Sequence, residues 1–189
     1  MRRLLLALPF ALLPLAIAQA ADEHDHDHEH GSLGAHEHGV GSLNVALDGQ
    51  TLELALDGPS VNLVGFEHIA TTDADKAKVA SARAQLENPL VLFSLPKAAG
   101  CIADQQELES PLFEAAPEEA GGGAKAAHHH SDIEAHYAFT CSKPEALKTL
   151  DLTQFFKTFP GTQKIKVQLI GANGQQGVEV TPKAPTLTF

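Results

Sequence analysis

Residues 36–68, HEHGVGSLNVALDGQTLELALDGPSVNLVGFEH, decide the fold of this chain. Leucine and valine alternate with polar or small residues on both sides of Asp48-Gly49. Such alternation predicts two strands with one buried face, and Asp-Gly between them predicts a tight hairpin turn, because Gly tolerates positive φ. The remainder of the chain must therefore cover the leucine face of this hairpin.

The segments that follow predict helices and further strands. Residues 72–88 favour a helix that begins with a capping box of Thr72 and Asp75 and ends before Pro89. The apolar run at 90–95, LVLFSL, predicts a central strand. Residues 152–159 predict a short helix that ends at Pro160-Gly161.

The C-terminal half predicts more antiparallel sheet. Residues 101–108 and 133–141 are expected to pair, and setting Cys101 opposite Cys141 centres the arm on Gly121. Residues 165–180 predict a second hairpin that turns at Asn173-Gly174, whereas 144–151 are ambiguous between strand and helix. We therefore predict an α+β domain at 36–189, made of antiparallel β-hairpins and sheet with one longer and one short helix.

The N-terminus indicates export. Two arginines precede an apolar run, and Ala18-Gln19-Ala20 is a small-x-small cleavage site, which together predict a signal peptide over residues 1–20. A membrane anchor is the alternative, but Pro9 and Pro14 interrupt the run and it is short for a membrane span. The mature protein is expected to start at Ala21, with no membrane anchor, in the periplasm of a Gram-negative-type envelope.

The net charge of the chain indicates which kinds of partner it can bind. Loss of Arg2 and Arg3 with the signal peptide changes the formal net charge from −11 to −13. A chain this acidic repels nucleic acid and anionic lipid and attracts cations. Nucleic acid is therefore not an expected partner.

Histidines are the candidate metal ligands, and they fall into three groups. The leader at 21–35 is polar enough to be disordered, and a flexible loop is expected at 110–131. The leader group is His24, His26, His28 and His30; the loop group is His128, His129 and His130; the group expected to be ordered is His36, His38, His68 and His136. The alternatives are a merely solvated leader and a structural role for His68.

The ligand types indicate the metal. Neutral imidazole and carboxylate bind zinc, nickel and copper(II) well. Met1 is the only methionine, so the mature chain lacks the thioether ligands that copper(I) favours. Zn²⁺ is the expected ion, with other divalent transition metals as alternatives. Asp25, Asp27 and Glu29 should favour protonated imidazole in the leader, so binding there should weaken at low pH.

The two cysteines, Cys101 and Cys141, leave two possibilities open. In an exported protein a lone pair of cysteines favours a disulfide, because the periplasm oxidises thiols. The alternative is a pair of thiolate metal ligands.

Several motifs together resemble the ZrgA-like family of periplasmic zinc-uptake proteins. They are HxHG before a strand, the DG turn, GP, GFEH, the paired cysteines and FFKTFPG near the C-terminus. The resemblance implies a zinc-binding role in uptake across the envelope, with a zinc transporter or its binding protein as partner.

Two other classes of function compete with zinc uptake. A zinc hydrolase would need rigid ligands and a nearby base, but HExxH, HxHxDH and GxSxG are all absent from the sequence, so an enzyme is not expected. A periplasmic buffer or resistance protein for copper, nickel or zinc could use the same histidines. Only the family resemblance separates that class from uptake.

Overall fold

The computed structural model describes residues 37–114 and 131–189. The predicted signal peptide, the leader and most of the predicted loop lie outside the described residues. So do eight of the candidate ligands: His24, His26, His28, His30, His36, His128, His129 and His130. What the sequence predicts for those segments remains a prediction.

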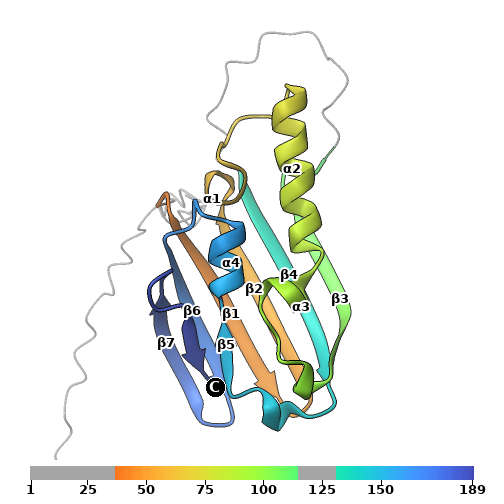
Figure 1. Ribbon diagram of the computed structural model, residues 1–189, viewed down its shortest axis with the longest axis vertical. Helices are drawn as coiled ribbons and strands as arrows, with labels where there is room; N and C mark the ends of the chain where they lie inside the picture. Colours follow the sequence, from red (N-terminus) through yellow and green to blue (C-terminus); the bar gives the residue numbers. More distant parts are fainter. Residues whose placement is uncertain (1–36, 115–130) are drawn as a thin grey trace, which may run out of the picture. The chain divides into compact units, whose positions relative to one another are not determined.

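A six-stranded sheet forms the centre of the described chain (Figure 1), with strand order β3-β4-β2-β1-β6-β7. Neighbouring strands are antiparallel except for β1 and β6, which run parallel. The strands are β1 Val40–Asp48, β2 Thr51–Pro59, β3 Cys101–Glu109, β4 Asp132–Cys141, β6 Lys164–Gly171 and β7 Gly174–Val180. A second, two-stranded sheet pairs β5, Thr149–Asp151, with β8, Thr186–Thr188. The predicted α+β class is confirmed.

Helices lie over one face of the large sheet (Figure 1). They are α1 Ser60–Val64, α2 Asp73–Leu86, α3 Pro89–Leu92 and α4 Thr153–Thr158, with 3₁₀ turns at Lys97–Ala99 and Pro144–Ala146. The predicted start of α2 is confirmed, since Thr72 is the N-cap and its Oγ1 accepts a hydrogen bond of 3.1 Å from the Asp75 backbone N–H. The ambiguous segment at 144–151 contains both a 3₁₀ turn and β5.

The predicted hairpin forms over residues 40–59, with its turn one residue later than the predicted Asp48-Gly49. Leu43, Leu52 and Leu54 are buried, and the turn consists of Gly49 and Gln50, because Asp48 still pairs with Thr51. Gly49 has a φ of +56°, which a side chain would strain. The hairpin therefore provides the two central strands of the sheet.

The prediction of a central strand at 90–95 is wrong. This segment contains the short helix α3 and a turn that leaves Ser94 at a φ of +49°. Leu92, Phe93 and Leu95 are buried, whereas Leu90 and Val91 are exposed, and the Phe93 ring lies 5.6 Å from the Tyr137 ring. A short apolar run does not distinguish a strand from a buried helix, and Pro89 suits the first position of a helix.

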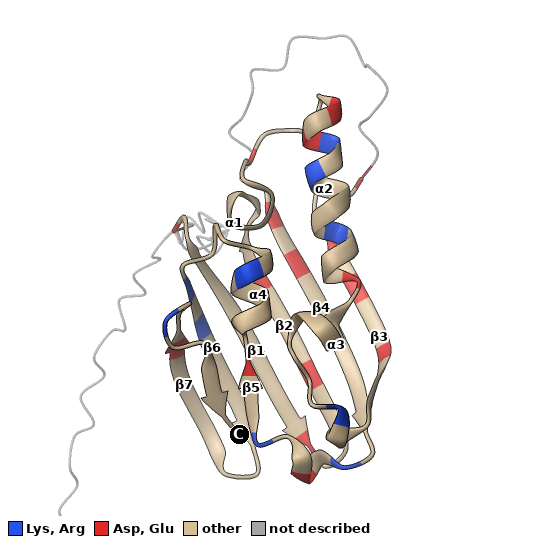
Figure 2. Cartoon of the chain, viewed as in Figure 1, with Lys and Arg blue, Asp and Glu red and all other residues tan. Residues whose placement is uncertain are grey.

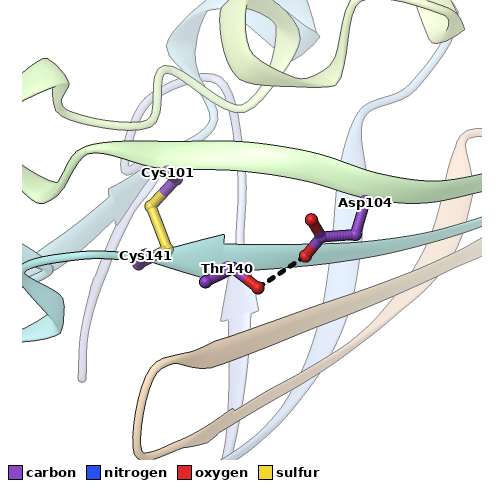
Figure 3. Close-up of a disulfide and its surroundings, with 4 residues drawn as sticks. All are labelled: Cys101, Asp104, Thr140 and Cys141. Carbon is purple, nitrogen blue, oxygen red and sulfur yellow. Dashed lines mark hydrogen bonds between the residues drawn. A yellow bond between two sulfur atoms is a disulfide. The ribbon is translucent and has the colours of Figure 1, made fainter.

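The predicted pairing of β3 with β4 is confirmed, and so is its register at Cys101 and Cys141. The two cysteines are joined by a disulfide (Figure 3). A bulge between Ala103 and Gln105 then shifts the register by one residue, and Thr140 Oγ1 donates a 2.6 Å hydrogen bond to the displaced Asp104. The disulfide excludes the alternative of two thiolate metal ligands.

Side chains from distant segments close the core on the helical face. The buried face of β4 carries the predicted residues Ile133, Ala135, Tyr137, Phe139 and Cys141. The Tyr137 hydroxyl donates a 2.9 Å hydrogen bond to the Leu86 carbonyl at the end of α2, and burial raises the pKa of Tyr137. This bond satisfies a polar group inside the core and ties α2 to β4.

Candidate metal-binding site

Three segments meet at one end of the large sheet and bring histidine and carboxylate side chains together. His38 precedes β1, Glu67 and His68 follow α1, and Asp75 lies in the first turn of α2. His38 Nε2 lies 3.1 Å from Glu67 Oε1, and His68 Nε2 lies 3.4 Å from Asp75 Oδ2. The two histidine side chains are 66% and 62% exposed, so solvent can reach both.

The backbone beside His38 is fixed by a buried asparagine of α1. Asn62 Oδ1 accepts a 2.7 Å hydrogen bond from the Gly39 N–H, and Asn62 Nδ2 donates one of 2.9 Å to the Val40 carbonyl. The Gly39 carbonyl accepts bonds from the N–H groups of Gln163 and Lys164. Gly39 has a φ of +84°, a conformation that other residues rarely adopt. His38 therefore extends from a rigid part of the chain.

Two buried serines hold the backbone beside His68. The Ser60 hydroxyl donates a 2.7 Å hydrogen bond to the Phe66 carbonyl, and the Ser131 hydroxyl donates one of 3.1 Å to the Glu67 carbonyl. The two hydroxyl oxygens are themselves 2.7 Å apart. Because Ser131 directly precedes β4, the start of that strand is tied to the segment that carries Glu67 and His68.

The His68 ring has two further contacts. It stacks on the buried Phe66 ring, with the ring centroids 4.5 Å apart. Its partner Asp75 has a lowered pKa, chiefly because the Thr72 hydroxyl donates a hydrogen bond to the carboxylate; burial opposes this effect, and the hydrogen bond with His68 supports it. Asp75 therefore keeps its negative charge beside His68 to lower pH than an ordinary aspartate does.

These residues supply imidazole and carboxylate, the ligand types of zinc. They form two separate pairs: within residues 37–114 and 131–189, no group of three or more His, Cys, Asp or Glu side chains is arranged to hold a metal ion. Along the chain, however, His36 is two residues before His38, and His130 directly precedes Ser131. Candidate ligands outside the described residues are thus adjacent in sequence to two of the segments at this end of the sheet, the one that carries His38 and the one that begins with Ser131.

A family model for the ZrgA family zinc uptake protein matches residues 35–189. The chain belongs to the ZrgA family of zinc uptake proteins. The match begins immediately before His36 and includes the whole described part of the chain. No curated protein matches this chain.

Membership of the ZrgA family confirms the predicted resemblance and supports a general role in zinc uptake. The family is named for uptake and not for catalysis. In the described part of this ZrgA-family chain, no helix is long and apolar enough to span a membrane.

The structure of this ZrgA-family chain separates His136 from the other described histidines. His136 lies on the outer face of β4, where its Nε2 is 3.9 Å from Glu134 Oε2. It pairs in register with Ala55, which pairs with Asn44 in the middle of β1, whereas His38 precedes the start of β1. His38 and His68 are therefore brought to one end of the sheet and His136 is not.

Sequence reasoning identified the histidines but missed the residues that contact and hold them. Glu67 was visible as the neighbour of His68, and Asp75 as part of the helix cap, but neither pattern shows contact with an imidazole. Asn62 and Ser131 carry no sequence signal for their roles. Their partners are between 22 and 71 residues away along the chain.

Asn62→Ala is expected to lower the free energy of unfolding by about 3 kcal/mol, because it leaves the Gly39 N–H and the Val40 carbonyl without a partner near the core. Urea denaturation measures this change. Asn173→Ala is the control, since Asn173 makes a single exposed hydrogen bond to the Phe189 carbonyl. Equal losses from the two variants would contradict a special role for Asn62.

Proposed function

We propose that this chain is a periplasmic zinc-binding protein that captures Zn²⁺ with its histidine-rich segments and passes it to a zinc transporter or to the binding protein of that transporter. Membership of a zinc uptake family supports the process. One structural observation supports the mechanism: His38, Glu67 and His68 lie together, on fixed backbone, where the histidine-rich segments join the sheet.

In this proposal the two kinds of segment do different work. The leader, with four histidines among acidic residues, offers many interchangeable ligands and gathers zinc. His38 and His68 provide a more rigid pair of imidazoles, with Glu67 and Asp75 as a further ligand or as hydrogen-bond partners that orient the rings. His36, His128, His129 and His130 complete the coordination. His136 is a separate and weaker candidate on the sheet face.

Calorimetry with Zn²⁺ on the purified mature chain tests this division of roles. His38→Ala/His68→Ala should weaken the tightest binding event, whereas His136→Ala, which removes another exposed histidine beside a carboxylate, should leave it unchanged. If the double variant binds zinc as the wild type does, the ordered pair takes no part in capture.

Deletion of residues 22–30 is expected to reduce the number of zinc ions bound while leaving the melting temperature of the metal-free protein nearly unchanged. The deleted segment contains no apolar side chain that could contribute to the core. Calorimetry gives the stoichiometry and thermal denaturation in a chelator gives the stability. Cooperative loss of structure after the deletion would contradict this expectation.

A metal buffer or resistance protein would use the same residues as a zinc-uptake protein. The two roles differ in how expression of the gene is regulated. Transcription of the gene during zinc starvation supports uptake, whereas induction by excess copper, nickel or zinc supports resistance. Binding of copper or nickel in preference to zinc by the mature chain would likewise favour the second role.

A further inference from the structure

The face of the large sheet opposite the helices is open and hollowed. A cavity of about 990 Å³ lies on it, lined by residues from all six strands. Its lining includes short side chains of the central strands: Ala46 of β1, Ala55 of β2 and Ala138 of β4. Longer side chains rise at its sides, including Glu107 on β3 and Ile170 on β6. Alanine on central strands therefore creates a trough across the sheet.

This trough is acidic. Glu53, Asp104 and Glu107 line it, and none of its lining residues is lysine or arginine. Figure 2 shows acidic positions on β2, β4 and β3, whereas the lysines of the sheet lie on β6. Of the ion pairs between described residues, none involves Glu53 or Glu107.

The register brings further acidic residues together on this face, beside the trough; one of them, Glu134, also lies 3.9 Å from His136 and shares a second pocket with Arg83. Asp57 of β2 lies directly opposite Glu134 of β4, and Glu134 lies directly opposite Glu109 of β3. Like charges directly opposite each other on neighbouring strands destabilise a sheet. A cationic occupant of this face would relieve that repulsion.

We propose that this open face is the docking surface for a cationic polypeptide segment of a partner protein. Charge complementarity selects this occupant. A second copy of the chain would bring the same acidic face, an anionic membrane would be repelled, and the chain's own leader carries Asp22, Glu23, Asp25, Asp27 and Glu29. Ile102 and Ile170, which are 62% and 54% exposed, offer apolar contacts to the aliphatic parts of lysine or arginine side chains.

The trough lies across the middle of the sheet, away from His38 and His68 at one end, but it is lined by His136, the weaker zinc-ligand candidate. The experiment therefore includes a chelator, so that its outcome does not depend on the proposed function. The probe is a ten-residue peptide of alternating lysine and alanine with blocked ends, added to the full mature chain at low salt. Amide chemical shifts locate the binding, and their titration gives the affinity.

The expected shifts cluster at Ala55, His136 and Ala138. Glu53→Gln/Glu107→Gln/Glu134→Gln should bind the peptide about tenfold more weakly, which corresponds to the loss of three exposed charge pairs. The same variant should be more stable, because repulsion across β2, β4 and β3 is relieved. The matched control Asp73→Asn/Glu87→Gln/Glu145→Gln removes equal charge from the start of α2, from its C-cap and from the 3₁₀ turn at Pro144–Ala146, and should bind as the wild type does.

Equal weakening in both triple variants would mean that the peptide responds only to net charge, and would overturn the proposal. Shifts centred on α2 or on the His38 end would overturn it too, as would absence of binding at low salt. Self-association of the wild type through this face, seen by sedimentation, would identify a second copy as the occupant instead.

Discussion

Replacing Cys101 and Cys141 with alanine is expected to lower the free energy of unfolding by about 4 kcal/mol in the chain-entropy model. The disulfide joins residues 40 positions apart, so it removes much of the freedom of a long loop in the unfolded chain. Alanine is preferred to serine because Cys141 is completely buried, and a hydroxyl there would need a partner. Urea denaturation of the double variant and of the wild type measures the difference.

The loss should be largest in β3. This edge strand buries little, since only Cys101 and Leu108 are partly buried against the core. Its remaining attachment is the ladder to β4 and the Asp104–Thr140 hydrogen bond (Figure 3). Amide hydrogen exchange should therefore accelerate in β3 far more than in β1 or β2.

Reduction of the wild-type protein provides the control for the disulfide. It retains both sulfur atoms, so any further loss in the alanine variant measures packing alone. A reduced protein as stable as the oxidised one would show that the covalent link contributes nothing to stability, and would contradict the expectation.

Zinc binding is expected to weaken about tenfold for every histidine ligand as the pH falls from about 7.5 to about 5.5. A histidine must lose its proton to bind metal, and the reference pKa of imidazole is about 6.5. The protonated fraction therefore rises through this window, and protons compete with zinc. A site built mainly from carboxylates would hold its metal until about pH 4.

The pH dependence of zinc affinity also tests whether the ordered histidines bind the metal. In a chain that lacks residues 22–30, His38 and His68 together account for a loss of about a hundredfold across the window, and each further histidine ligand adds about tenfold. His38→Ala/His68→Ala in that chain should give weaker binding at pH 7.5 and a flatter profile, whereas His136→Ala should change neither. Competition with a chromophoric chelator at each pH measures the affinities. An unchanged slope in the double variant would exclude both residues as ligands.

Local patterns in the sequence predicted much of the fold correctly. Alternation predicted both hairpins, but their turns lie at Gly49-Gln50 and Ala172-Asn173, each one residue from the predicted Asp48-Gly49 and Asn173-Gly174. Thr72 and Asp75 predicted the start of α2, and the cysteines gave the register of β3 with β4. These features depend on neighbouring residues or on one covalent link. The segment at 90–95 failed because burial alone does not select a strand.

The candidate site could be predicted only in part. The abundance of histidine indicated zinc, and the motifs around residues 36–38 and 66–68 indicated the family. Neither reveals that His38 contacts Glu67 or that His68 contacts Asp75. Such contacts between exposed side chains leave no periodic pattern in the sequence.

The sequence by itself determined the hairpins, the long helix, the disulfide register and the ligand chemistry, because each follows from local conformational preference or from residue type. Only the tertiary structure decided the parallel pairing of β1 with β6, the joining of His38 to the Glu67–His68 segment, and the open trough on the far face. These depend on which buried surfaces pack together across long separations in the chain. The hydrophobic effect is non-directional, so a sequence pattern can show that a face is buried without showing which other segment packs against it.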